Sequence, residues 1–175
     1  MLELFPAGHQ NQSLRNLATS LTSRFERSGE CEDLEEAISL HQDALDLPAG
    51  HANRSRSLNN FAHSLKKRFE QSGECEDLDE AISLLQDALA LFPAGHPNRS
   101  RPLNNLAWLL TVRFEQSGEC KDLDEAISLL RDALEQCPAC YPIRSASLNT
   151  LAELLRRRFE QSGERKDLDE AISLH

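Results

Sequence analysis

Two cysteines separated by two residues, Cys137 and Cys140, have the spacing of redox-active dithiols and of half a zinc site. A redox pair is expected beside a βαβ pattern, and a zinc site needs further ligands at a matching spacing. The sequence provides neither, and the equivalent turns elsewhere read Phe-Pro-Ala-Gly. We therefore interpret the pair as part of a turn, and we predict no metal and no cofactor.

Other reactive side chains also lack a catalytic arrangement. His9, His51 and His96 recur at regular intervals, which is typical of a structural role. The adjacent carboxylates Glu35 and Glu36 lie where a helix is expected to begin, and there they complement the helix dipole. The sequence contains no P-loop, no Gly-x-Ser-x-Gly and no dinucleotide-binding fingerprint. It predicts a protein that is not an enzyme and has no catalytic residues.

Three phrases recur in one phase along the whole chain. Arg-Phe-Glu begins at Arg24, Arg68, Arg113 and Arg158, in steps of 44, 45 and 45 residues. The phrase Asp-Leu-(Asp/Glu)-Glu-Ala-Ile-Ser-Leu follows at the same steps, and Pro-Ala-Gly-His recurs between these units. Such self-similarity is typical of repeat proteins. We predict a single solenoid over residues 1–175, with repeats at about 10–50, 51–95, 96–140 and 141–175, the last truncated, and residues 1–9 as the tail of a preceding helix.

Each repeat has the pattern of two helices. In the third repeat, apolar residues at three- and four-residue spacing predict a first helix over about 101–116, with Pro102 in its first turn and Gly118 as its stop. A second helix is expected to begin at Asp122, whose side chain would cap it together with Glu125 in a capping box, and to end near Pro138. No strand pattern competes, so the predicted fold class is all-α.

Composition narrows the range of partners. The net charge is −10, whereas a nucleic-acid-binding surface needs excess positive charge. No apolar run reaches the ~20 residues of a membrane span, and the first residues lack the features of a signal peptide. We predict a cytoplasmic protein without nucleic-acid or membrane partners. Three cysteines fall on equivalent turns too far apart for disulfides, and we expect them to be reduced thiols: Cys31, Cys75 and Cys120.

The columns of these repeats resemble the tetratricopeptide repeat. In the third repeat, the first-helix signature is matched by Leu103, Leu106, Ala107 and Leu110, and the second-helix signature by Ala126, Leu130, Ala133 and Pro138. The long period and the phrase Leu-Asn-Asn-Leu-Ala are similar to the kinesin light chain subtype, as found in fungal tandem-repeat proteins. The resemblance implies a right-handed superhelix of αα-hairpins whose first helices line a concave face.

One asparagine column lies on the predicted first helices. Asn16, Asn60 and Asn105 occupy it, and Thr150 replaces them in the fourth repeat. An amide both donates and accepts hydrogen bonds, so it suits the backbone of a peptide ligand, and the resemblance implies such a ladder. The alternative is that these amides tie neighbouring helices together. The residues leave both interpretations open.

Cations and the only tryptophan extend this candidate site. Trp108 stands in a column that is otherwise polar, which favours either a binding hot spot or burial between repeats. Of the 19 Lys and Arg, 15 lie in or just before first helices, and 24 of the 29 Asp and Glu lie elsewhere. Such segregation favours an acidic peptide partner, unless these charges pair within the scaffold. Nearby candidate contacts are Arg56, Lys67, Arg101 and Arg157.

These patterns predict a protein-interaction scaffold that binds an extended peptide segment of a partner protein in a concave groove. One alternative is a sensor or regulatory segment of a larger NTPase receptor or caspase-like peptidase protein. A remote alternative is an RNA-binding helical repeat, which the acidity disfavours. Neither end of the sequence has a polar capping helix, so we expect either a piece of a longer array or head-to-tail self-association.

Overall fold

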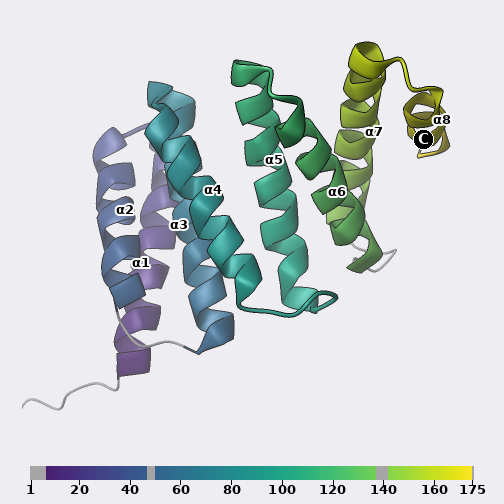
Figure 1. Cartoon of the computed structure of the whole chain (residues 1–175). Coiled ribbons are helices and arrows are strands. Elements are labelled where there is room, and N and C mark those ends of the chain that lie inside the picture. The colour runs from purple at the N-terminus through teal and green to yellow at the C-terminus, as the bar shows by residue number, and fades with distance from the viewer. Residues whose placement is uncertain (1–6, 47–49, 137–141, 175) are drawn as a thin grey trace, which may run out of the picture. The chain divides into compact units, whose positions relative to one another are not determined.

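A computed structural model of the chain describes residues 7–46, 50–136 and 142–174. These residues form eight α-helices and one short 3₁₀ turn, with no strand among them (Figure 1). In chain order the elements are α1 (Ala7–Ser28), α2 (Cys31–Asp46), α3 (His51–Ser72), α4 (Cys75–Ala90), η1 (Pro97–Arg99), α5 (Ser100–Ser117), α6 (Cys120–Gln136), α7 (Pro142–Ser162) and α8 (Arg165–Ser173). The predicted all-α fold of tandem helical hairpins is confirmed.

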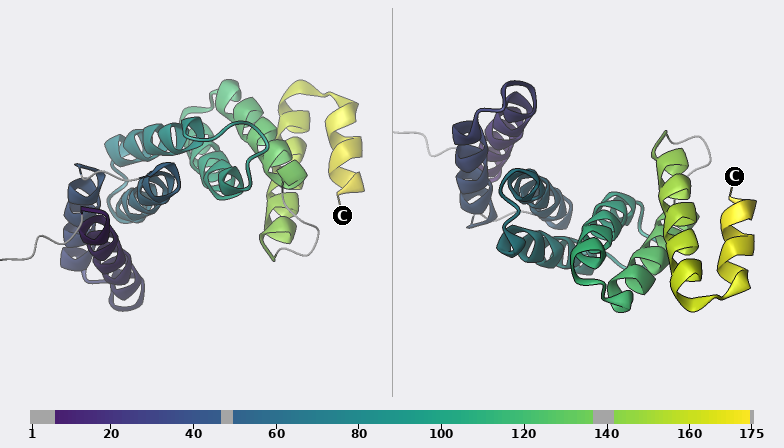
Figure 2. Two further views of the ribbon diagram at one scale, coloured as in Figure 1. Left: turned by 90° about the horizontal axis from the view of Figure 1, so that it is seen from below. Right: turned by 90° about the horizontal axis from the view of Figure 1, so that it is seen from above.

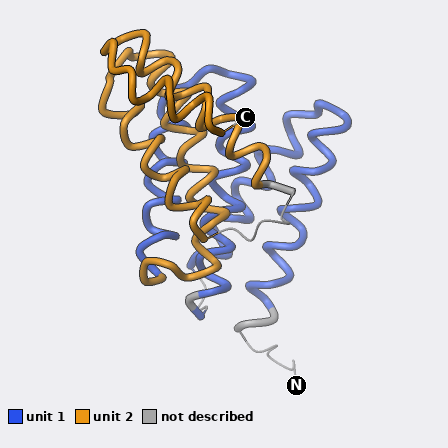
Figure 3. The backbone as a smooth tube through the Cα atoms, turned by 90° about the vertical axis from the view of Figure 1, so that its right-hand side faces the viewer, with its two compact units in different colours: residues 1–91 blue, residues 92–175 orange. Residues whose placement is uncertain are grey.

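The chain divides into two compact units, drawn in different colours in Figure 3. Unit 1 covers residues 1–91 and contains the hairpins α1–α2 and α3–α4. Unit 2 covers residues 92–175 and contains η1 with the hairpins α5–α6 and α7–α8. The pairing of each long first helix with its second helix is visible from both directions in Figure 2.

A glycine ends each first helix. Gly29, Gly73, Gly118 and Gly163 all have a φ between 71° and 75°, a left-handed conformation that is easy only for glycine. Each glycine N–H donates to the carbonyl of the phenylalanine four residues earlier, at 2.8 Å in all four cases. The stop predicted at Gly118 is therefore confirmed, as is Pro102 in the first turn of α5.

The predicted capping role of Asp122 is wrong. Helix α6 begins at Cys120, two residues earlier than expected, and the Asp122 side chain is buried. In the equivalent helices α4 and α8, the residues at the N-cap are Glu74 and Glu164, and neither side chain makes a capping hydrogen bond. The aspartate has a different partner, which lies on the first helix.

Each hairpin is closed by one arginine–aspartate pair, which we call the clamp. In the third repeat, Arg113 Nε and Nη2 donate to the two carboxylate oxygens of Asp122 at 2.8 and 2.9 Å. Such a two-bond geometry is the strongest form of this ion pair. In two of the equivalent pairs, hydrogen bonds from the arginine hold the pKa of Asp33 and the pKa of Asp167 below their usual range. Equivalent bidentate clamps join Arg24 to Asp33, Arg68 to Asp77 and Arg158 to Asp167.

Small and aromatic residues pack the hairpins around the clamp. Two alanine columns lie where first and second helices approach, and all eight alanines are buried. Phe25, Phe69 and Phe114, from the Arg-Phe-Glu phrase, are buried near the end of the first helix and extend this core. The alanines are Ala18, Ala62, Ala107 and Ala152 on first helices, and Ala37, Ala81, Ala126 and Ala171 on second helices.

Within each unit, the second hairpin docks on the first through one stripe of its long helix. On α3 the stripe is Arg54, Phe61 and Arg68, spaced seven residues apart and therefore on one face. Arg54 Nη1 donates to the Leu45 carbonyl at 3.0 Å, and Arg68 Nη1 donates to Glu35 at 3.0 Å. Between them, the buried ring of Phe61 stacks on a histidine of α2.

The same stripe recurs in unit 2. Arg144, Leu151 and Arg158 occupy the equivalent positions on α7. Arg144 Nη1 donates to the carbonyl of Leu134 at 2.7 Å, Leu151 is buried, and Arg158 Nη1 donates to Asp124 at 2.9 Å. Within each unit, the interface between repeats is therefore built from three groups. They are one arginine near the start of the first helix, one apolar side chain, and the Nη1 atom of the clamp arginine, which the clamp itself does not use.

The histidine under Phe61 is His41, and it is buried with both ring nitrogens lacking a hydrogen-bond partner. Leucine fills this column in the next two repeats, at Leu85 and Leu130. Burial, together with the positive charges of His63 and Arg15, lowers the pKa of His41 to about 4. The imidazole is therefore neutral in the folded chain at neutral pH.

Breaking one clamp should destabilise the fold. We expect Asp122→Asn to lower the free energy of unfolding by about 2–4 kcal/mol, because Arg113 would lose its charged acceptor in a buried site. The measurement is urea unfolding followed by circular dichroism. Glu125→Gln, an exposed change three residues along the same helix, is the control and should stay within about 0.5 kcal/mol of the wild type. Equal effects of the two changes would contradict the structural role of the clamp.

Acid should weaken the chain through His41. Its folded pKa lies below the value of ~6.5 for an unfolded histidine, so the unfolded state binds more protons between these values. Stability should therefore fall as the pH drops from about 6.5 towards 4, by up to about 3 kcal/mol from this residue. His41→Leu should remove that part of the slope and raise stability at pH 5. Gln42→Leu, an exposed change on the same helix that alters no titratable group, should leave the slope unchanged in the same urea titrations.

Candidate peptide-binding surface

The first helices of each unit lie side by side. In unit 1, the hydroxyls of Thr22 on α1 and Ser64 on α3 are 2.9 Å apart and buried. In unit 2, Ser147 Oγ on α7 donates to Asn104 Oδ1 on α5 at 2.5 Å. Each unit thus has a pair of neighbouring first helices whose outer residues include the predicted site residues, and each pair is described separately.

The asparagine column has unequal surroundings. Asn16 is exposed on α1, whereas Asn60 and Asn105 are half-buried on α3 and α5. Asn60 Nδ2 donates to the hydroxyl of Thr19 on α1 at 3.2 Å. This bond joins neighbouring first helices, although through a side chain and not through the backbone. At Asn60, the scaffold interpretation therefore has direct structural support.

Two of the predicted cations are paired within the scaffold. Lys67 Nζ lies 3.0 Å from Glu70 on its own helix and 3.7 Å from Glu26 on α1. Arg157 binds Glu153 at 2.9 Å and reaches Glu115 on α5 at 2.6 Å. Hydrogen bonds from Arg156 and Arg157 lower the pKa of Glu153 to about 2, so it keeps its charge at any ordinary pH.

The other two predicted cations differ. Arg56 and Arg101 are exposed and occupy equivalent positions on α3 and α5. The structure gives neither one an ion pair with another described residue. Each lies four residues before an asparagine of the column, Asn60 or Asn105, so cation and amide share one helix face. The structure therefore brings together Arg56 with Asn60 in unit 1, and Arg101 with Asn105 in unit 2.

His63 on α3 and Trp108 on α5 occupy the same position in their repeats, next to the arginine and asparagine just described. Both are half-buried and lie three residues after the asparagine of their helix. His63 Nε2 lies 3.3 Å from Glu26 on α1. Burial lowers the pKa of His63, and the Glu26 carboxylate opposes this effect. An aromatic ring thus extends the Arg-Asn face in both units.

Sequence reasoning missed the role of three arginines that precede or begin first helices. Arg54 and Arg144 donate to carbonyls in the last turn of the preceding second helix, where four carbonyls lack helical partners, and Arg99 donates to a carbonyl just after α4. The distances from Nη1 are 3.0, 2.7 and 2.7 Å, for Arg54 to Leu45, Arg99 to Phe92 and Arg144 to Leu134. The recurrence of arginine at this one position in three repeats could have indicated a structural role. Much of the positive charge counted on first helices is therefore used internally.

The remaining reactive groups form no cluster in the described part of the chain. No group of three or more His, Cys, Asp or Glu among the described residues could hold a metal ion. Cys31, Cys75 and Cys120 are exposed thiols that form no disulfide with another described residue. His96 accepts a hydrogen bond from the Asn98 N–H and stacks on Phe92, which fits a structural role. Cys137 and Cys140 lie outside the described residues, as do the side chains of His9 and His51.

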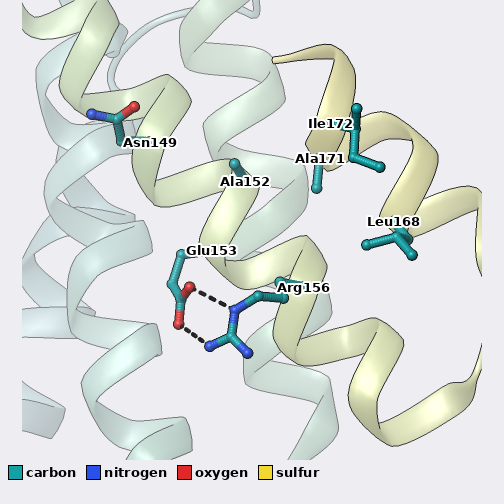
Figure 4. Close-up of a pocket in the computed structure, with 7 residues that line it drawn as sticks. All are labelled: Asn149, Ala152, Glu153, Arg156, Leu168, Ala171 and Ile172. Carbon is teal, nitrogen blue, oxygen red and sulfur yellow. Dashed lines mark hydrogen bonds and ion pairs between the residues drawn. The ribbon is translucent and has the colours of Figure 1, made fainter. Parts of the chain in front are cut away.

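A largely apolar cleft of about 330 Å³ lies between α7 and α8 (Figure 4). Glu153 and Arg156 form an ion pair on one side of it, while Leu168 and Ile172 project from α8 on the other. The cleft is lined by Asn149, Ala152, Glu153, Arg156, Leu168, Ala171 and Ile172.

No described helix is long and apolar enough to cross a membrane.

Residues 12–53 match the family model of the tetratricopeptide repeat. Among solved structures, the chain is similar to the nearly identical TPR-like repeats of a Podospora anserina putative kinesin light chain, at 21% identity over 94% of this chain and 72% of that one, with a TM-score of 0.66. A variant of that protein gives 22% identity, 95% and 72% coverage and a TM-score of 0.67. A de novo designed helical repeat protein is 21% identical over 95% of this chain and 90% of its own, with a TM-score of 0.53. None of the curated proteins compared by sequence matches.

The matched segment covers most of α1, all of α2 and the start of α3, and the other three hairpins carry the same phrases at the same positions. Residues 12–53 thus resemble a tetratricopeptide repeat, and the chain as a whole shares the fold of tandem helical hairpins with the TPR-like repeats of the Podospora anserina protein. Its architecture is that of a helical repeat scaffold.

The pairing of His63 with Glu26 can be tested by titration. Glu26→Gln should lower the pKa of His63 further below its usual range, because burial already lowers it and the carboxylate would no longer oppose this. Imidazole NMR titration, with His63→Gln to assign the signal, measures the change. Glu32→Gln on α2 is the control and should leave the His63 titration in place. An unmoved pKa in the Glu26 variant would mean that Glu26 is free to meet a ligand.

Proposed function

We propose that each unit binds an extended, acidic peptide segment along its first helices, with Arg56 and Asn60 making the main polar contacts in unit 1 and Arg101 and Asn105 making them in unit 2. The observation that supports this most directly is the repeated Arg-Asn face. Both arginines are exposed, and neither is neutralised by another described residue. Most of the other cations on first helices have acidic or carbonyl partners inside the scaffold.

The chemistry of the two side chains suits such a ligand. A guanidinium binds a carboxylate with two parallel hydrogen bonds, so Arg56 and Arg101 favour Asp, Glu or a C-terminal carboxylate. An amide four residues along the helix can donate to or accept from a peptide backbone group, whatever the peptide sequence. Asn60 would exchange its bond to Thr19 for one to the ligand. His63 and Trp108 supply aromatic surface beside each pair.

Binding through these contacts should be weak and salt-dependent. Each hydrogen bond contributes about 0.5–1.5 kcal/mol net, and exposed charges are screened at physiological ionic strength. We therefore expect micromolar affinity that falls as salt rises. Nothing in this arrangement provides a nucleophile with its base, so the proposal is for binding and not for catalysis.

The test begins with selection of ligands from a displayed library of peptides with free C-termini. Selected peptides are then measured by fluorescence anisotropy against Arg56→Ala with Asn60→Ala, and against Arg101→Ala with Asn105→Ala. Each double variant should weaken binding by about tenfold or more if two such contacts are lost. The affinity of each double variant for the peptide should also depend less on salt concentration than that of the wild type.

The matched control is Lys121→Ala, which removes an exposed cation from a second helix. It should bind the selected peptides as the wild type does. The proposal fails if both double variants, with unchanged helicity, bind like the wild type, or if Lys121→Ala weakens binding as much as they do.

A further inference from the structure

The two ends of the described array expose opposite halves of the interface that joins repeats inside each unit. On α1, Leu17 occupies the position that Phe61 and Leu151 hold on the later first helices. Phe61 and Leu151 are each 2% exposed, whereas Leu17 is 48% exposed. This apolar position is buried on α3 and α7, each of which follows another hairpin in its unit. On α1 the same position is open to solvent.

The clamp arginine of the same helix shows the same difference. Arg68 and Arg158 use Nε and Nη2 for the clamp, and Nη1 for an acidic residue of the preceding hairpin. Arg24 makes the clamp with Nε and Nη2, and its side chain is 58% exposed, against 28% for Arg68. The stripe of Leu17 and Arg24 on α1 is thus an exposed counterpart of the docking stripe that α3 and α7 bury within their units.

The complementary half lies on α8. Ile172 is 66% exposed, whereas its equivalents Ile38 and Ile127, which are followed by another hairpin in their unit, are at most 5% exposed. Beside it is the apolar cleft between α7 and α8, and Ile172 lies at its edge in Figure 4. Asp169 is exposed on α8, at the position from which Glu35 and Asp124 bind the clamp arginine of the next hairpin.

We propose that two copies of this chain associate head to tail, with Leu17 and Arg24 of one copy docking on the α7–α8 cleft of another. Leu17 covers Ile172 and the cleft, and Arg24 Nη1 binds Asp169. Both contacts repeat those that already join α3 to α2 and α7 to α6. A second copy fits because its docking stripe matches this surface in both apolar and charged positions. Such a contact uses different surfaces on the two partners, so it leaves further ends open for growth.

The first test is sedimentation velocity of the whole chain over a range of concentrations. The wild type should form dimers and longer species as concentration rises, and Leu17→Asp and Ile172→Asp should each weaken association by about tenfold or more, as expected for a central contact. Ser83→Asp adds the same charge at an exposed site on α4 and should associate as the wild type does. Circular dichroism confirms that each variant keeps its helicity. A wild type that stays monomeric up to about 1 mM, at the weak limit of measurable affinity, overturns the proposal.

The second test separates this arrangement from a symmetric dimer. The Leu17→Asp chain keeps an intact α7–α8 surface, and the Ile172→Asp chain keeps an intact α1 stripe. Mixed, the two monomeric variants should form a one-to-one dimer that grows no further, because the remaining surfaces carry the substitutions. Failure of the mixture to dimerise while the wild type associates would show a different contact and overturn the proposal. Asp169→Arg, which places a cation opposite Arg24, should also weaken wild-type association, and no effect would contradict the charged contact.

Discussion

A buried carboxylate cannot remain charged without a partner that replaces its water, and four such carboxylates lie among the residues that the structure describes. Each is held by two hydrogen bonds from an arginine of the preceding helix, so the two helices of a hairpin are fixed in one register. The same arginine has a third nitrogen, and in Arg68 and Arg158 it binds the preceding hairpin. One side chain therefore sets both the geometry inside a repeat and the contact between repeats. The alanine columns can pack closely because this register is fixed.

Internal use of charge also decides what the surface can recognise. An acidic chain with cations gathered on its first helices suggests a basic face, but pairing removes most of that character. Clamp arginines, helix-end arginines and the Lys67 and Arg157 pairs are engaged within the scaffold. The charge that remains is sparse and repeated, at Arg56 and Arg101. The proposed recognition therefore depends on a few specific contacts within each unit and not on the total charge.

Much of the fold could be predicted from the sequence because its strongest signals are local. A glycine with positive φ and a proline in a first turn are fixed by backbone sterics, so Gly118 and Pro102 marked the helix correctly. The clamp could not be predicted in the same way. Asp122 near a helix start has the appearance of a cap, and only the packed structure shows that its side chain turns inward to an arginine nine residues away in the chain.

The candidate site was harder to predict than the fold, for a related reason. Placing Asn60, Arg56 and Arg101 on first helices requires only the helical period. Whether a polar side chain there meets solvent or a neighbouring helix depends on packing between repeats, as the bond from Asn60 to Thr19 shows. The exposed leucine at position 17 illustrates the same dependence, because its residue type is that of a core position while its surroundings differ.

The constant separation inside the clamp determines where this array can change in length. Arginine and aspartate are nine residues apart in all four hairpins, while the repeats themselves begin 44, 45 and 45 residues apart. The difference of one residue therefore falls between an aspartate and the next clamp arginine, and never within the turn that the clamp spans. An insertion in the Ser-Gly-Glu turn would carry the aspartate away from its guanidinium, whereas an insertion between hairpins leaves every clamp intact. Natural length variants of such repeats, and loops added by design, should accordingly be tolerated at the connections between hairpins.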